Sequence, residues 1–229
     1  MQRRKFTSGA VSLGGLLALS VGAEAASLSE GDATLGVRAA LERGAVAAVG
    51  LLGKSGGFLD NPKVRIPLPG FLKDAAQLLK FTGQQKRVDE LVTAMNRAAE
   101  AAVPEAKALL VSAVKSMSVS DATRLIRGGE NSVTDFFAEK TRAPLGVKFL
   151  PIVTRATEKV SLANKYNRVA GKAAGFGLVK DEDANVQQYV TRKALDGLFL
   201  MIGEEERKIR ADPVGTGSAI LGKVFGALK

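Results

Sequence analysis

Apolar residues recur every three or four positions along most of the chain, which is the spacing of one face of an α-helix. The pattern is clearest in residues 85–103, where the apolar positions are Val88, Leu91, Val92, Met95, Ala98, Ala99 and Ala102. Similar patterns predict helices over residues 33–52, 71–81, 104–117, 118–127, 131–142, 144–160, 161–172, 183–211 and 213–227. No linker long enough to separate two domains interrupts them. The predicted fold class is therefore all-α, in a single multi-helix domain.

Residues 58–70 break this helical pattern. Their prolines exclude a regular helix and favour extended geometry at the preceding residues. These prolines are Pro62, Pro67 and Pro69. The apolar residues of the segment alternate with other residues and are Val64, Ile66 and Leu68. We predict that this proline-rich segment, the arm, is extended or forms an edge strand, and that it lies against the helices.

The first 25 residues have the order of a secretory signal peptide. A cationic start precedes a weakly apolar stretch over residues 9–21, and small residues follow at Ala23 and Ala25. The apolar stretch is too short to cross a hydrocarbon core about 30 Å thick. We predict cleavage after Ala25, which leaves residues 26–229 as a soluble periplasmic domain without a transmembrane anchor.

Two interpretations of the export route remain open. Arg3, Arg4 and Phe6 match the twin-arginine consensus, in which two arginines are followed by any residue and then Phe. An ordinary Sec signal is the alternative, because Gln2 stands where Ser or Thr is usual. The sequence contains no cysteine, so a lipid-anchored lipoprotein is excluded.

The absence of both His and Cys restricts the possible chemistry. It excludes the usual zinc sites, Ser-His-Asp and Cys-His nucleophiles, haem ligation and iron–sulfur clusters. Carboxylate pairs, Lys, Tyr and carboxylate-bound Ca²⁺ or Mg²⁺ remain available. We expect neither a cofactor nor a metal site.

The chain is basic, with a formal net charge of +10. Export would separate it from nucleic acid, so we expect no nucleic-acid partner. Anionic lipids of the envelope are the polyanions that it would meet, and weak contact with them is electrostatically reasonable. The plainer interpretation is that Lys and Arg solvate helix surfaces, since no run of five like charges occurs.

Two groups of polar residues are candidates for chemistry. Asn96, Arg97 and Glu100 share one helix face among alanines that would let another helix approach closely. Lys193 and Asp196 are spaced as an ion pair in an otherwise apolar helix. We predict that the two groups meet in one network. This network is either a structural lock between helices or a ligand pocket with an acid/base carboxylate.

Three smaller features carry expectations of their own. Gly197 lies inside a predicted helix, where it costs about 1 kcal/mol relative to Ala, so we expect another segment to approach closely there. Acidic Glu204–Glu206 followed by basic residues up to Arg210 predicts ordinary ion pairs on a helix surface. The loop at Gly175–Gly177 could close over a ligand.

Three stretches together resemble a known family. They are Gly57-Phe58-x-x-Asn61-Pro62-x-Val64-x-Ile66-Pro67-Leu68-Pro69; Met95-Asn96-Arg97-Ala98-Ala99-Glu100 with Val103-Pro104; and Tyr189-Val190-Thr191 through Lys193-Ala194-Leu195-Asp196-Gly197-Leu198-Phe199 to Glu204-Glu205-Glu206 and Ile209-Arg210. In combination they resemble an uncharacterised bacterial family catalogued as domain of unknown function 4197. The resemblance implies an envelope-located helical domain and no known activity. Many relatives look like lipoproteins, and this chain differs from them in lacking the cysteine.

Three functional hypotheses follow from the sequence. The leading one is a non-enzymatic periplasmic binding or interaction protein that uses an apolar groove or a helical surface. The second is a hydrolase built on Glu100 and Asp196, which requires a concave site with both carboxylates close together. The third is a protein whose basic helix faces bind anionic envelope lipids in a salt-sensitive way.

Overall fold

Helices make up most of the computed structural model, which describes residues 30–212 apart from residues 71, 74–75, 77–80, 130, 178 and 181–182. They are α1 (Glu30–Leu52), α3 (Gln85–Ala102), α4 (Ala106–Lys115), α5 (Val119–Arg127), α6 (Ser132–Thr157), α7 (Ser161–Gly175) and α8 (Val186–Ala211), with a 3-10 turn η1 (Val103–Glu105) joining α3 to α4. Among the described residues there is no β-strand. The all-α prediction is confirmed.

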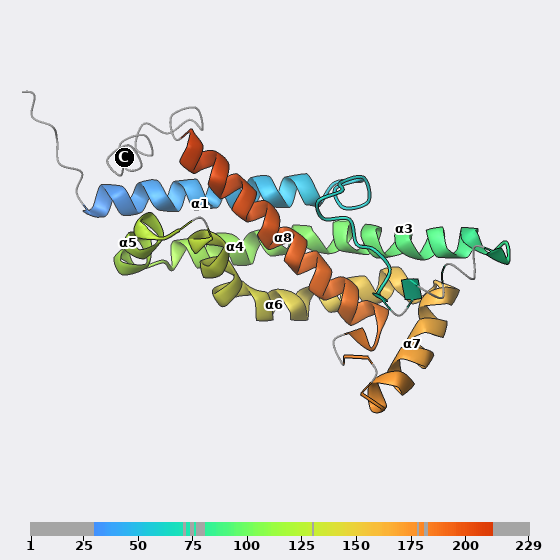
Figure 1. The fold of residues 1–229 in the computed structure, drawn as a ribbon. Helices are drawn as coiled ribbons and strands as arrows, with labels where there is room; N and C mark the ends of the chain where they lie inside the picture. Colours follow the sequence, from blue (N-terminus) through green and yellow to red (C-terminus); the bar gives the residue numbers. More distant parts are fainter. Residues whose placement is uncertain are drawn as a thin grey trace, which may run out of the picture.

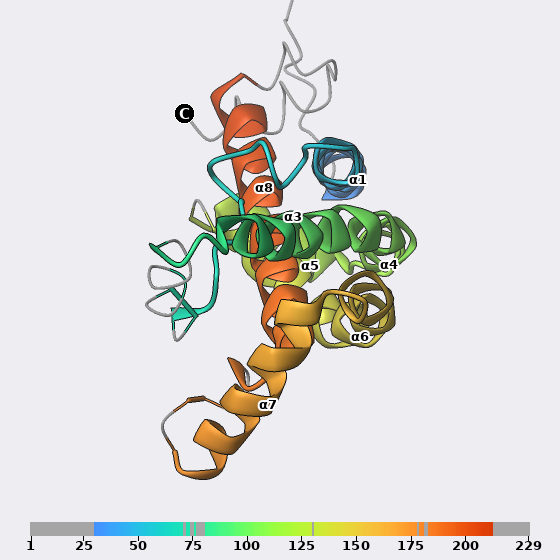
Figure 2. The same cartoon turned by 90° about the vertical axis from the view of Figure 1, so that its right-hand side faces the viewer.

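The helices form a row that one further helix crosses (Figures 1 and 2). The α1 helix, the α3–α4 pair and α6 lie side by side. Helix α8 crosses them obliquely and packs on α6, α1 and α3. The apolar positions predicted in α3 form part of the core, with Val88, Leu91 and Met95 all buried. Apolar burial along these interfaces is the main force that holds the row together.

Helix α6 corrects the sequence prediction of two helices over 131–142 and 144–160. It is continuous, although Pro144 and Pro151 lie inside it. A proline removes one N–H donor and leaves the carbonyl four residues earlier without its usual partner. Both prolines are exposed, and so are Lys140 and Val147, which carry those carbonyls. Water can therefore satisfy the freed carbonyls, while the opposite face of α6 stays packed in the core.

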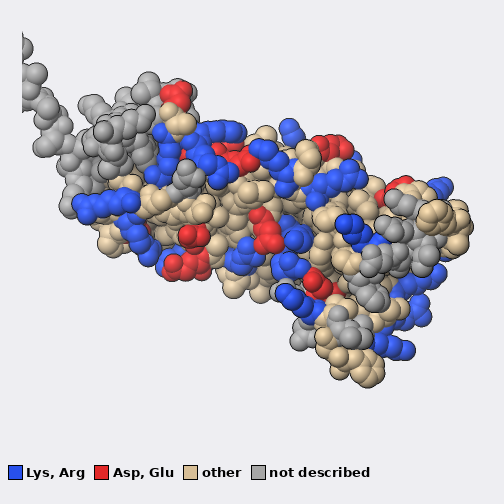
Figure 3. All heavy atoms as spheres, viewed as in Figure 1, with Lys and Arg blue, Asp and Glu red and all other residues tan. Residues whose placement is uncertain are grey.

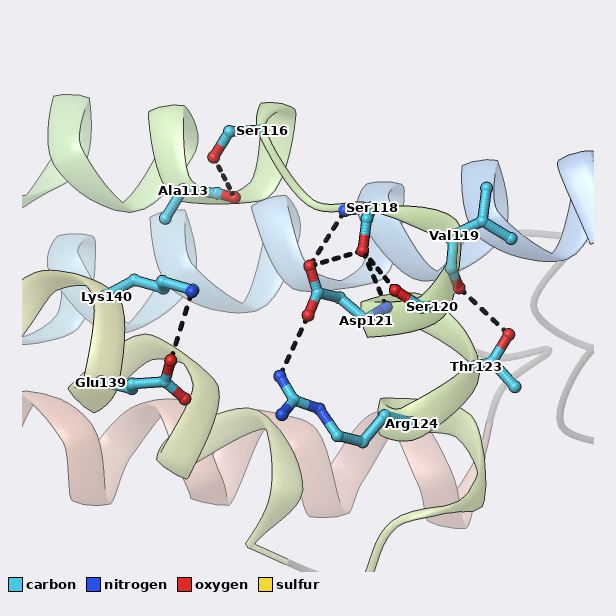
Figure 4. A network of polar contacts seen from close by, with 10 residues as sticks. All are labelled: Ala113, Ser116, Ser118, Val119, Ser120, Asp121, Thr123, Arg124, Glu139 and Lys140. Atoms are coloured by element: carbon cyan, nitrogen blue, oxygen red, sulfur yellow. Dashed lines mark hydrogen bonds and ion pairs between the residues drawn. The ribbon is translucent and has the colours of Figure 1, made fainter.

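The start of α5 shows how local sequence sets a helix boundary (Figure 4). The Ser118 hydroxyl accepts a hydrogen bond from the Asp121 N–H at 3.0 Å, and the Asp121 carboxylate accepts the Ser118 N–H at 3.0 Å. This is a capping box, and it satisfies two backbone donors that the first turn leaves unpaired. The hydrogen bonds from Ser118 lower the pKa of Asp121 below its ordinary value. The helix predicted over 118–127 is thus present as α5, and Ser118 is its cap.

Several predictions fall outside the described residues. They include the helix over 213–227, the export residues Arg3, Arg4 and Phe6, and the cleavage residues Ala23 and Ala25. The predicted helix over 71–81 is described only in part. Within the described residues, no helix combines the length and the apolar character needed to cross a membrane.

Candidate functional site

The arm connects α1 to the segment before α3 and lies against α3 and α8 (Figure 1). It begins after Gly56, whose φ of +83° is a conformation that glycine adopts readily. Turns follow as far as Val64, and residues 65–69 are assigned neither helix, turn nor strand. The arm is thus irregular and forms no edge strand, and Pro67 and Pro69 favour extended geometry at the residues before them. Phe58 is its main apolar anchor and is completely buried.

Glu100 holds the first part of the arm. One of its carboxylate oxygens accepts hydrogen bonds from the backbone N–H groups of Phe58 and Leu59, each at 3.0 Å. The other oxygen accepts one from Arg97 at 2.6 Å, and Arg97 also donates to the Ser55 hydroxyl at 2.7 Å. Burial alone would raise the pKa of Glu100, but the N–H groups and Arg97 together outweigh burial and lower it. Glu100 is therefore held as a carboxylate.

Asn96 holds the second part of the arm. Its side-chain carbonyl accepts the Ile66 N–H at 2.8 Å, and its amide donates to the Ile66 carbonyl at 3.0 Å. The amide also donates to the Val92 carbonyl at 2.8 Å. Asn96 is fully buried, so it pairs with the arm as a neighbouring strand would and leaves no buried backbone group of Ile66 unpaired.

Helix α8 completes this arrangement from the other side. The Tyr189 hydroxyl donates to the Pro67 carbonyl at 3.1 Å, and burial raises the pKa of Tyr189 to about 12. Lys63 and Glu204 form an ion pair at 2.7 Å. Together, Asn96, Glu100 and Tyr189 form a clamp on the backbone of the arm. Sequence reasoning missed Tyr189, since a hydroxyl that binds a backbone carbonyl follows no motif.

Gly197 lies where the arm passes over α8. A Cβ atom at this position would stand 2.8 Å from the Phe58 ring and 3.2 Å from the Val64 side chain. The glycine therefore allows the arm to approach the α8 backbone closely. This is the close approach that a glycine inside an apolar helix led us to expect.

Asp196 belongs to a different set of contacts. It pairs with Arg142 of α6 at 2.8 Å and with Arg192 at 3.9 Å. Arg142 also lies over the Phe199 ring, 5.1 Å from its centroid. The structure thus brings Asn96, Arg97 and Glu100 together, but Asp196 and Glu100 have different partners in these contacts. The predicted pairing with Lys193 is replaced, because α8 packs on α6 and brings Arg142 within reach.

The acidic run of α8 departs from the prediction of simple surface pairs. Lys208 and Glu205 do pair at 2.6 Å near the surface. Glu206, in contrast, is 5% exposed and accepts hydrogen bonds from Arg210 at 2.8 Å. Burial raises the pKa of Glu206, although the bonds from Arg210 and Ser132 oppose this. A small cavity of about 30 Å³ lies beside Glu206, walled mainly by apolar residues of α1, α5 and α8.

The chemistry of the clamp is limited by how completely its polar atoms are used. Both oxygens of Glu100 and both polar atoms of the Asn96 side chain bind residues of the chain itself. Within the described residues, no group of three or more Asp or Glu side chains is placed to hold a metal ion. Of the two interpretations of the polar cluster, the geometry favours the structural lock.

A second surface stands apart from the clamp. Helix α7 projects away from the row of helices, and the chain turns back after it (Figure 2). At its end Phe176 is 82% exposed, and Val169 on the helix is 52% exposed. Residues 161–177 are named the finger. The sequence indicates a loop at Gly175–Gly177 that could close over a ligand, but here Phe176 is open to solvent.

Comparison with known proteins identifies the family of the chain. A family model described as protein of unknown function (DUF4197) matches residues 27–226. No curated protein and no solved structure matches the chain. The matched range includes the arm, the clamp and the finger.

Proposed function

The chain belongs to the family described as protein of unknown function (DUF4197), and we propose that it is a non-enzymatic interaction protein of the bacterial envelope. We further propose that the finger is its binding surface. The observation that carries the proposal is the exposure of Phe176 and Val169 on an element that projects from the body of the protein. Val169 and Phe176 are seven residues apart, about two helical turns, so they lie on one side of the finger. Exposed apolar groups gathered on one side are typical of interaction sites.

The alternative of a carboxylate hydrolase has no supporting observation. A general acid needs a carboxyl that keeps its proton near neutral pH, and this requires a raised pKa. The pKa of Glu100 is lowered instead, and its oxygens are occupied by the arm and by Arg97. Asp196 is paired with Arg142. The binding of both carboxylates to residues of the chain itself supports the interaction protein over the hydrolase.

The finger is suited to binding because its base is fixed. Asn167 accepts the Val186 N–H at 2.8 Å and donates to Gln187 at 2.8 Å. Gln187 donates in turn to the Thr157 hydroxyl at 3.1 Å. Binding at the exposed face would therefore need little ordering of the finger, which reduces the entropic cost of association.

A sedimentation experiment with bacterial envelope membranes tests this function. We expect residues 26–229 to sediment with the membranes and the double variant Val169→Ser/Phe176→Ser to stay in the supernatant. The matched control is Phe81→Ser, because Phe81 is 90% exposed but lies outside the finger. Circular dichroism would verify that each variant is folded. Equal sedimentation of the double variant and the wild type would contradict the proposed function.

A further inference from the structure

The charge pattern of the finger indicates the chemistry of its partner. Between Glu158 and Asp181 the sequence contains no acidic residue, and its five cations are Lys159, Lys165, Arg168, Lys172 and Lys180. All five are exposed. In Figure 3, Lys and Arg side chains gather along the outer edge of the part that contains α7. This segment therefore presents a one-signed surface to any partner.

Three of these cations lie on one face of α7. Lys165, Arg168 and Lys172 are spaced by three and four residues, so they share the side of the helix opposite the buried Tyr166 and Ala170. In the described part of the chain, none of these three cations forms an ion pair. Their charge is available to an outside partner.

Apolar groups lie on the same face as the cations. Val169 lies between Arg168 and Lys172 in the sequence, and its side chain is half exposed. Phe176 follows one turn beyond Lys172, just past the end of the helix. Gly177 turns the chain directly after it with a φ of +71°, which leaves the phenyl ring at the tip.

We propose that the finger binds an anionic lipid surface, with the cations against the head groups and Phe176 inserted below them. This inference rests on the proposed function and names its partner. Basic side chains are attracted to anionic head groups, and an exposed aromatic side chain is stabilised by burial at the boundary between head groups and acyl chains. An acidic protein would satisfy the cations but gives no reason for a phenyl ring at the tip, beyond the last cation of the helix.

Fluorescence offers a direct test, because the chain contains no Trp. In Phe176→Trp, the introduced indole reports only on the tip of the finger. We expect its emission to shift to the blue and to be quenched by brominated lipids when vesicles containing about 30% phosphatidylglycerol are added. Phe81→Trp is the matched control, and we expect its emission to remain that of an indole in water.

The contribution of the three cations of α7 is tested in the Phe176→Trp variant. Adding Lys165→Gln, Arg168→Gln and Lys172→Gln should weaken vesicle binding on the order of a hundredfold, since each cation near an anionic leaflet contributes a factor of about five. Vesicles of phosphatidylcholine alone should produce no shift. If the emission of the Phe176→Trp variant is unchanged by anionic vesicles, or shifts equally with neutral ones, the inference is overturned.

The two proposals can fail separately. If the finger variants lose binding to envelope membranes but the wild type does not bind protein-free vesicles, the partner is an envelope protein or polymer. The lipid inference is then wrong and the proposed function stands. If the finger variants bind envelope membranes as the wild type does, the proposed function itself is wrong.

Discussion

The side chain of Asn96 binds both backbone groups of Ile66, a residue thirty positions earlier in the chain. This pairing fixes the second half of the arm on α3. Because Asn96 is fully buried, truncation would leave the Ile66 N–H and carbonyl without partners and without access to water.

We expect Asn96→Ala to lower the free energy of unfolding by about 3 kcal/mol, since each buried backbone group left unpaired costs about 1–3 kcal/mol. Urea denaturation followed by circular dichroism measures this change. Asp89→Ala on the exposed side of α3 is the matched control and should cost less than about 0.5 kcal/mol. A loss at Asn96 no larger than that at Asp89 would show that the clamp contributes nothing to stability.

Glu100 makes the stability of the folded protein depend on pH. Its pKa is lower in the folded protein than its ordinary value of 4.5. Its contribution to stability is therefore present above pH 4.5 and is lost as the pH falls through the lowered pKa. We expect Glu100→Gln to be less stable than the wild type at pH 7, and the difference to shrink on acidification below pH 4.5. Urea midpoints between pH 3 and 7 measure the difference, and a gap that stays constant with pH would refute this role.

Glu206 has the opposite dependence. Burial raises its pKa above the ordinary value of 4.5. A carboxyl of this kind binds its proton more tightly in the folded state, so its contribution is full below pH 4.5 and is lost as the pH rises through the raised pKa. We expect the stability of Glu206→Gln relative to the wild type to increase from pH 4 to pH 7. The same urea series measures it, and a relative stability that decreases over this range would contradict the prediction.

The export signal makes a prediction that is independent of the fold. If the route is twin-arginine translocation, replacing Arg3 and Arg4 by Lys should stop export and leave the precursor in the cytoplasm. Cell fractionation and the size of the product on a gel measure this. Normal processing of the Lys-Lys variant would assign the signal to the Sec route instead.

The sequence predicted what depends on neighbouring residues. The helices follow from local periodicity, and the helix predicted over 118–127 is present as α5. The shared face of Asn96 and Glu100 follows from helical spacing in the same way. The sequence analysis missed the continuity of α6 through Pro144. Whether the freed carbonyl is tolerated depends on its exposure to water, and the local sequence pattern does not indicate that exposure.

The sequence did not reveal what the candidate residues bind. Glu100 and Asn96 bind backbone groups of the arm, and every residue except proline has a backbone N–H, so no side-chain pattern could identify these partners. The prediction instead placed Glu100 with Asp196, since these were the polar groups available on otherwise apolar helices. Arg142 reaches Asp196 only because α6 and α8 pack together.

Gly197 shows where a local rule and a tertiary contact oppose each other. Ala is preferred to Gly inside a helix by about 1 kcal/mol. At this position, however, the new Cβ would stand 2.8 Å from the ring of Phe58, which is buried and cannot move aside freely. We expect Gly197→Ala to destabilise the protein by about 1–3 kcal/mol. At Gly171 in α7 an added Cβ would meet no atom of another element within 4 Å, so Gly171→Ala should instead be neutral or stabilising by up to about 1 kcal/mol. Urea denaturation of both variants tests the pair, and stabilisation of both would mean that the arm is not packed against α8 at Gly197.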